Sequence, residues 1–167
     1  MQAAGDARYI KEKLCERLQT EIFLDSDDLR DLRTLLTSVA QTDVLLILLT
    51  KDYLTRPYCL LEIHAAITHG IPMVAVHVVG GAFEYRFDHA QVFLANFEQA
   101  LHSCNPAAIE VLRQQGAEPS ALGATLRDHI PNIIAKTFQP SASANVLSAQ
   151  IDDIIEAMED AKTHKHN

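Results

Sequence analysis

The sequence predicts an α/β fold with a doubly wound parallel sheet. Two short apolar runs, 44–49 and 73–79, lack the polar alternation of half-exposed strands, which is typical of strands buried on both faces. Helical periodicity follows both runs, and strands that alternate with helices indicate a parallel sheet. The chain has 167 residues, of which 48% are hydrophobic and 22% charged, so we expect one globular domain over 1–167.

The front half of the chain alternates helix with strand. Its first helix follows from Ile10, Leu14 and Leu18, which recur every four residues. Its last helix ends at Gly70, which together with Pro72 stops the helical pattern. The predicted order is helix 7–19, short strand 22–24, helix 29–40, strand 44–49, loop 51–57 and helix 58–69.

The back half is longer and more helical. Asn105 followed by Pro106 predicts an N-cap with proline in the first helical turn, and Gly116 is the matching C-terminal glycine. Ser143 is expected to cap a long last helix. The predicted order is strand 73–79, loop 80–88, helix 91–103, a helical insertion over 104–129, a strand around 133–135, the last helix and a frayed tail over 162–167.

Composition excludes several classes of function. The 14 Lys and Arg against 22 Asp and Glu give a net charge of −8, which disfavours binding to nucleic acid and to anionic membranes. No apolar run approaches the roughly 20 residues that span a bilayer, and residues 1–13 do not form a secretory signal. Cys15, Cys59 and Cys104 form no CxxC pair, so we expect reduced thiols and a cytoplasmic location.

The loop Asp25-Ser26-Asp27-Asp28 admits two interpretations. It follows a strand, as the aspartate nucleophile of haloacid dehalogenase phosphatases does, and Asp25 with Asp27 could hold Mg²⁺. Asp27 or Asp28 could instead cap the helix that begins near Leu29. That phosphatase also needs paired aspartates after a late strand, and the strand around 133–135 is followed by none. The helix cap is therefore favoured.

The histidines and Cys59 match no metal or catalytic template. His64 and His69 are five residues apart, whereas HExxH places its histidines four apart on one helix face, so His64, His69 and His77 are expected in the core or on the surface. Cys59 lies at a helix start, which lowers a thiol pKa, but no histidine partner is evident. We expect no metal site and a packing role for Cys59.

Glu62 is the carboxylate with the most suggestive position. It lies one turn into the helix that follows strand 44–49, which we expect to be the most buried strand, and its sequence neighbours are apolar. Such surroundings raise the pKa of a carboxylate and strengthen its electrostatic effect. A glutamate in a first turn can instead simply complement the helix dipole. Both interpretations remain open from the residues alone.

Segments in the first half resemble Toll/interleukin-1 receptor (TIR) domains. The TIR pattern is a strand, a BB loop, a helix, an apolar strand ending in S/T-x-x-Y, then W-C-x-x-E-L and a glycine before the next strand. The matching residues are Ile22-Phe23-Leu24-Asp25, the acidic loop, the leucine-rich helix, Val44 to Leu49, Thr50-Lys51-Asp52-Tyr53-Leu54, Tyr58-Cys59-Leu60-Leu61-Glu62-Ile63 and Gly70-Ile71-Pro72. The resemblance covers 7–79 by motif and the remainder by element order.

The resemblance implies a flavodoxin-like sheet whose usual central first strand is missing, which leaves four strands. Nothing within 1–8 can serve as that strand. Strand 22–24 should therefore pair directly with strand 44–49 or leave a gap one strand wide. A gap would mean that the chain is a fragment or that another segment supplies the strand.

The resemblance also implies two activities in intracellular, innate-immunity-like signalling. Some TIR domains hydrolyse NAD⁺ with the glutamate of W-C-x-x-E-L, which corresponds to Glu62, and NAD⁺ is then a substrate rather than a cofactor. Tyr58, Cys59, Asp25 and Ser26 would contact it. Other TIR domains are adaptors that associate with themselves or with other TIR domains, largely through the BB loop. The corresponding interaction residues are Asp27, Asp28, Leu29, Arg30 and Asp31.

Overall fold

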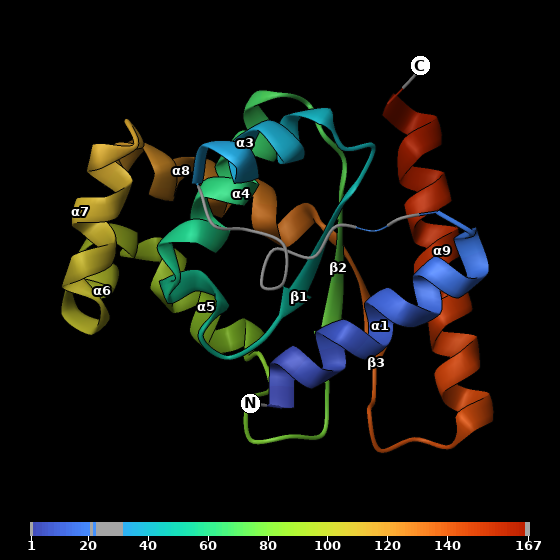
Figure 1. Cartoon of the computed structure of the whole chain (residues 1–167). Coiled ribbons are helices and arrows are strands. Elements are labelled where there is room, and N and C mark those ends of the chain that lie inside the picture. Colours follow the sequence, from blue (N-terminus) through green and yellow to red (C-terminus); the bar gives the residue numbers. More distant parts are fainter. Residues whose placement is uncertain (1, 21, 23–31, 166–167) are drawn as a thin grey trace.

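The fold is organised around a parallel three-stranded sheet (Figure 1). The structure, a computed structural model, describes residues 2–20, 22 and 32–165. The strands β1 (Leu45–Leu49), β2 (Met73–Val78) and β3 (Ile134–Phe138) follow one another across the sheet in that order. The predicted α/β class with a parallel sheet is confirmed. The fourth predicted strand, 22–24, lies outside the described residues apart from Ile22, so its pairing stays a prediction.

The central strand β2 is the most deeply buried. Val74 and Val76 are both 0% exposed, whereas Leu45, Leu46 and Leu48 of β1 are only partly buried. The sequence suggested β1 as the most buried strand, and that was wrong. The reason is position, because β1 lies at one edge of the described sheet and β2 has a strand on each side. A continuous apolar run identifies a buried strand but does not give its place in the sheet.

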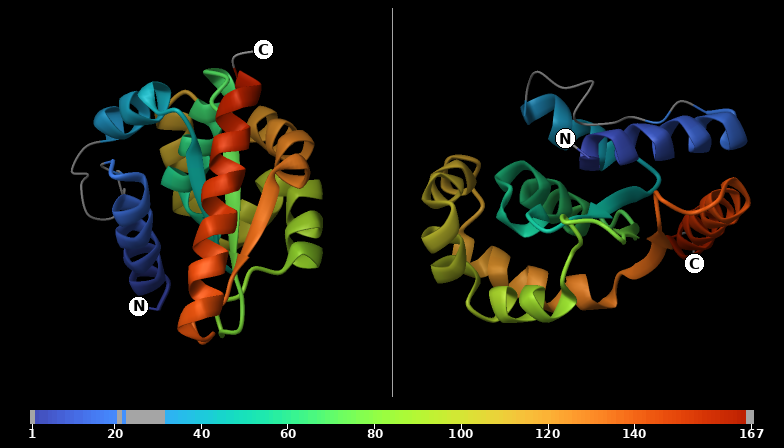
Figure 2. Two further views of the ribbon diagram at one scale, coloured as in Figure 1. Left: turned by 90° about the vertical axis from the view of Figure 1, so that its right-hand side faces the viewer. Right: turned by 90° about the horizontal axis from the view of Figure 1, so that it is seen from below.

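One face of the sheet is covered by the first and last helices, α1 (Gln2–Leu18) and α9 (Ala144–Lys165). Ile10 and Leu14 of α1 share a cluster with Ile151 and Ile154 of α9 and with inward side chains of the sheet. Arg17 pairs with Asp152 across the two helices. Figure 2 shows α9 crossing in front of the sheet. Residues 2–8 belong to helix α1 and form no strand, as the sequence predicts.

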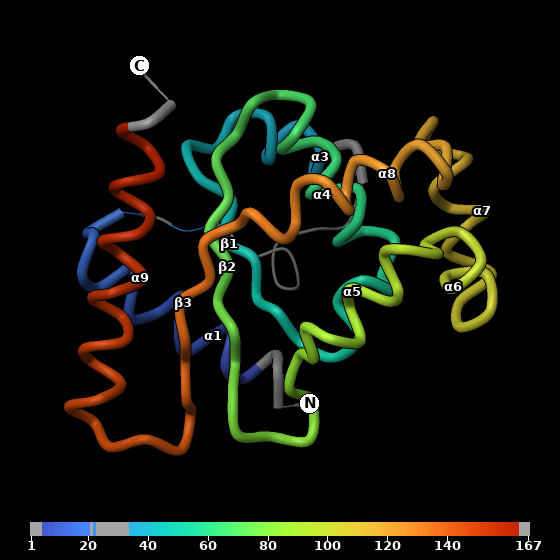
Figure 3. The backbone as a smooth tube through the Cα atoms, turned by 180° about the vertical axis from the view of Figure 1, so that it is seen from behind, coloured from blue at the N-terminus to red at the C-terminus, as the bar shows by residue number. Residues whose placement is uncertain are grey.

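The other face carries the remaining helices. They are α3 (Leu32–Gln41), α4 (Pro57–Thr68), α5 (Phe87–Ala95), α6 (Phe97–Cys104), α7 (Pro106–Gln114) and α8 (Pro119–His129). Helices α4 and α5 pack against Ile47, Leu49 and Ala75 of the sheet. Helices α6 and α7 lie at the end of the molecule opposite α9 (Figure 3).

Several predicted boundaries shift in the structure. The helix predicted over 91–103 is two helices, because the chain bends at Asn96, where φ is −127° and ψ is 41°. Short 3-10 helices, η1 (Tyr53–Thr55) within the predicted loop 51–57 and η2 (Ile130–Asn132) before β3, complete the described elements. The tail predicted to fray is helical as far as Lys165. Helix α3 confirms the described part of predicted helix 29–40.

The helical insertion over 104–129 belongs to the main hydrophobic core. Ala108, Ile109 and Leu112 of α7 and Leu122 and Leu126 of α8 are buried in the same cluster as α4 and α5. The predicted ends of α7 are confirmed: Asn105 is its N-cap residue, proline occupies its first turn, and Gly116 beyond its end has a φ of +76°, a backbone conformation that favours glycine. This part of the chain therefore supports the sheet-facing helices rather than standing apart from them.

We predict that Gly123→Ala destabilises the protein. A Cβ at Gly123 in α8 would lie 2.8 Å from two side-chain atoms of Phe97, one of them the Cβ, which cannot move without its helix. The resulting overpacking should outweigh the helix propensity that alanine adds and lower the free energy of unfolding by about 1–2 kcal/mol. Urea denaturation measures the change.

Gly5→Ala is the matched control, because Gly5 is also helical but a Cβ there would meet no atom within 4 Å. Only the propensity gain applies, so this variant should be more stable by up to about 1 kcal/mol. Equal effects of the two substitutions would contradict the close approach of α8 and Phe97.

Candidate functional site

The loops that follow β1 and β2 meet at the carboxyl edge of the sheet. In open parallel sheets this edge is where ligands bind. Thr50 forms an antiparallel bridge with Glu84, and the backbone N–H of Lys51 donates a 2.9 Å hydrogen bond to the carbonyl of Phe83. Thr50 is only 7% exposed. These bonds join the start of η1 to the loop after β2, so both loops take a defined position.

His77 and Glu84 approach each other beneath this junction. His77 lies near the end of β2, and its Nε2 is 3.1 Å from the carbonyl oxygen of Tyr85 and 3.6 Å from a carboxylate oxygen of Glu84. Because a carbonyl only accepts, Nε2 carries the proton. Glu84 also accepts a 3.1 Å hydrogen bond from the backbone N–H of Gly80. The arrangement closes the turn after β2 around an imidazole and a carboxylate.

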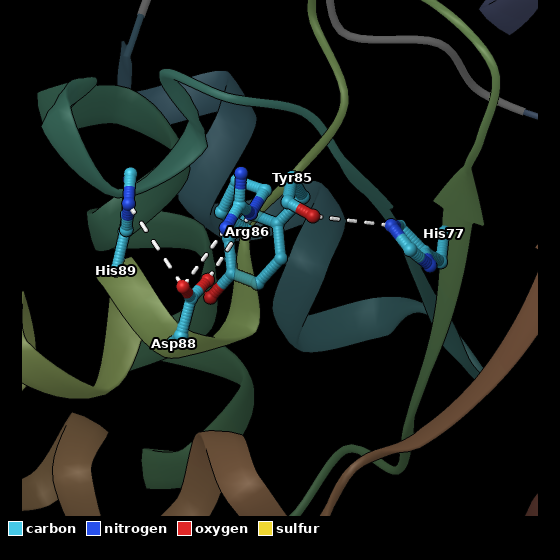
Figure 4. A network of polar contacts seen from close by, with 5 residues as sticks. All are labelled: His77, Tyr85, Arg86, Asp88 and His89. Atoms are coloured by element: carbon cyan, nitrogen blue, oxygen red, sulfur yellow. Dashed lines mark hydrogen bonds and ion pairs between the residues drawn. The ribbon is translucent and has the colours of Figure 1, made fainter.

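Three aromatic rings stack edge to face around the same turn. The ring of Phe87 lies 4.9 Å from that of His77 and 5.1 Å from that of Tyr85, with interplanar angles of 80° and 81°. Tyr85 is buried, and this burial raises the pKa of its phenol to about 12. In Figure 4, Tyr85 lies between His77 on one side and Asp88 on the other. These contacts fix the start of α5.

Arg86, Asp88 and His89 form a polar cluster at the start of α5 (Figure 4). The Arg86 guanidinium donates from Nε and Nη2 to the two oxygens of Asp88, at 3.2 and 2.9 Å. Arg86 lowers the pKa of Asp88 through these bonds. His89 lies 3.9 Å from the same carboxylate. All three side chains are exposed to solvent.

Glu62 lies in the second turn of α4, after Pro57 and Tyr58 begin the helix at the carboxyl end of β1. Its side chain is half-buried. Tyr58 is four residues earlier and therefore on the same helix face, where it is 50% exposed. Cys59 is half-buried on the adjoining turn. The structure thus brings three of the predicted site residues together on one helix.

Tyr53 is the residue at this site that sequence reasoning missed. It is buried in η1, and burial raises the pKa of its phenol well above the usual value, with smaller electrostatic contributions from Cys59 and Glu62. The phenol therefore stays protonated near neutral pH and lies within electrostatic reach of Glu62. The sequence did contain a signal for this residue, because Tyr53 is the tyrosine of the S/T-x-x-Y motif that begins at Thr50.

The other predicted site residues lie outside the described part of the chain. They are Asp25, Ser26, Asp27, Asp28, Leu29, Arg30 and Asp31. Their roles as substrate contacts, interaction loop, helix cap or magnesium ligands stay predictions.

The described residues show neither a metal-binding group nor a membrane-spanning helix. Within residues 2–20, 22 and 32–165, no group of three or more His, Cys, Asp and Glu side chains could hold a metal ion. In the same ranges, no helix combines the length and apolar character needed to cross a membrane. Comparison of the sequence with protein-family models and with curated proteins gives no match. The TIR resemblance therefore rests on the motif residues and the order of elements.

We predict that Tyr85 makes stability depend on pH in the alkaline range. Its folded-state pKa of about 12 exceeds the value of about 10 expected in the unfolded chain, so the folded state holds the proton more tightly. This contribution is complete below about pH 10 and is lost as the pH rises towards 12. Urea denaturation at several pH values should show a steeper loss of unfolding free energy in the wild type than in Tyr85→Phe. Parallel curves for the two proteins would contradict the burial of this phenol.

Proposed function

We propose that the chain is a TIR-like signalling domain that cleaves NAD⁺ at the bond between nicotinamide and ribose, with Glu62 as the catalytic carboxylate. The observation that carries the proposal is the position of Glu62, half-buried on α4 at the carboxyl edge of the sheet, where its charge adds to the effect of burial in raising the pKa of the Tyr53 phenol. The motif order from Thr50 to Glu62 supports the same assignment.

The chemistry needs little more than a well-placed negative charge. As the glycosidic bond breaks, positive charge builds on the ribose, and a carboxylate beside it stabilises that oxocarbenium-like state. Nicotinamide leaves as a neutral molecule, so no strong general acid is required. Water then adds to the ribose carbon and releases a proton, giving ADP-ribose.

The apolar surroundings of Glu62 strengthen this effect. Leu60, Leu61 and Ile63 next to it are buried in the core, so the helix that carries Glu62 cannot rotate its polar face away from the site. A half-buried carboxylate also acts through a lower effective dielectric than an exposed one, which increases its attraction for a developing cation. The side chain of Tyr53 is itself held in place by its burial in η1.

We predict that Glu62→Gln lowers NAD⁺ cleavage at least about a hundredfold, because glutamine keeps the shape of the side chain and removes its charge. Nicotinamide release, measured at high protein concentration, reports the activity. Glu156→Gln is the matched control, since Glu156 is an exposed glutamate on α9, on the opposite face of the sheet. Release that persists in Glu62→Gln, or falls equally in both variants, would contradict the proposal.

A second candidate is a non-catalytic adaptor that associates with itself. The specific observation is Tyr58, a large aromatic residue that is 50% exposed at the start of α4, the helix that packs against α3. Helix α3 directly follows the predicted interaction loop, so Tyr58 fits association through that loop and the helices near it. The phosphatase alternative gains no comparable support, because Gln139 and Pro140 follow β3 where that pattern needs paired aspartates.

We predict for the adaptor candidate that Tyr58→Ala weakens self-association, because it removes exposed apolar area from the contact. Sedimentation velocity over a range of concentrations measures the average mass. Val146→Ala is the control, since Val146 is an exposed apolar residue on α9. A monomer at all concentrations, or equal effects of both substitutions, would count against the adaptor. Glu62→Gln should leave the mass unchanged.

A further inference from the structure

We propose that a groove between η1 and α5 binds a small molecule that carries both a phosphate group and a planar ring. The groove has a volume of about 630 Å³ and lies at the carboxyl edge of the sheet. Pockets for small molecules commonly span roughly 300–1,000 Å³. Its walls come from the loop after β1, the turn after β2 and the first two turns of α5. Each of these segments is held by contacts described above.

Positive charge gathers in this groove although the chain is acidic. The chain carries a net charge of −8, yet two cationic side chains, Lys51 and Arg86, line the groove with the imidazole of His89 and one carboxylate, that of Glu84. The charge of Glu84 is directed to His77 and to the backbone of Gly80. Within the described ranges no carboxylate pairs with Lys51. Among the residues that the structure describes, an exposed lysine without a carboxylate partner, beside an arginine that keeps one nitrogen free, favours an anionic ligand.

The Arg86 guanidinium is oriented by its ion pair with Asp88. Asp88, which does not itself line the groove, accepts hydrogen bonds from Nε and Nη2 of Arg86. The remaining nitrogen, Nη1, has no hydrogen bond within the described part of the chain. Because a pre-positioned guanidinium loses little freedom on binding, such an arginine suits phosphate oxygens. Lys51 supplies a second, more mobile charge.

The remaining wall of the groove suits a flat ring. Leu54, Ala90 and the half-buried Phe93 provide apolar lining. The ring of Phe93 packs edge to face against Phe97, with centroids 5.8 Å apart and planes at 87°, so its orientation is fixed. A planar ligand group can stack on such a surface while its phosphate reaches the cations. The groove therefore combines the two features that a phosphorylated ring compound requires.

This site is distinct from the proposed catalytic carboxylate. Among the described residues that line the groove, none belongs to α4, which carries Glu62. Buried Tyr53 in η1 connects the two regions, because the next residue, Leu54, lines the groove, while burial and the charge of Glu62 both raise the pKa of the Tyr53 phenol. The inference does not depend on NAD⁺ cleavage and can succeed or fail separately from it.

Calorimetric titration with AMP tests the inference, because AMP has one planar ring system and one phosphate. We expect AMP to bind, and Lys51→Gln and Arg86→Gln each to weaken binding about tenfold or more through the loss of a charge-assisted contact. Adenosine and inorganic phosphate should each bind more weakly than AMP. Backbone amides of Gly81 and Ala82, which line the groove, should shift in NMR spectra on titration.

Matched controls separate the groove from general charge effects. Arg113 is also an exposed arginine paired with a carboxylate, Glu98 at 3.1 Å, and Lys162 is an exposed lysine that pairs with Asp43 at 3.6 Å. Arg113→Gln and Lys162→Gln should leave AMP affinity unchanged. Absence of AMP binding at millimolar concentration, or equal loss in groove and control variants, would overturn the inference. Equal affinity for AMP and adenosine, or for AMP and phosphate, would also overturn it.

Discussion

Burial of the central strand on both faces is the constraint on which the rest of the structure depends. Val74 and Val76 on one face of β2 are 0% exposed and Ala75 on the other face is 2% exposed, and a parallel strand of this kind requires helices above and below it. Helices α1 and α9 cover one face and α4 and α5 the other. Because each crossover returns the chain in the same direction, the carboxyl ends of the strands lie at one edge. The polar residues that follow β1 and β2 are brought together for this reason.

The two loops at that edge act as one unit. The bridge between Thr50 and Glu84 ties η1 to the turn after β2, and Glu84 in turn contacts His77 inside the sheet. A change of position in one loop therefore requires a change in the other. This coupling matters for the two proposed sites, because η1 carries Tyr53 towards Glu62 on one side and Leu54 into the groove on the other.

Periodicity in the sequence was sufficient for the described strands and most of the helices. The apolar runs around Leu45–Leu49 and Met73–Val78 predict strands because they lack polar alternation, with His77 as the one polar residue in the two runs. The break at Asn96 escaped prediction, since Phe93 and Phe97 keep helical spacing across it and only the backbone angles reveal the bend. Of the candidate sites, the residues of α4 could be predicted from motif order. The approach of His77 to Glu84 could not, because it depends on how the turn after β2 folds back, which no local pattern encodes.

The helices of the insertion hold the short 3-10 helix η1 in place at the carboxyl edge of the sheet. Asn105 is the N-cap residue of α7, but its side chain makes no capping hydrogen bond; its side-chain amide instead donates a 2.9 Å hydrogen bond to the carbonyl of Thr55. Thr55 ends η1 and also lines the groove. The buried side chains of α7 and α8 thereby anchor η1 from outside, while the bridge from Thr50 anchors its start. An enlarged back half is thus a structural support for the loop that separates Glu62 from the groove, and the position of Tyr53 between them follows from these two attachments.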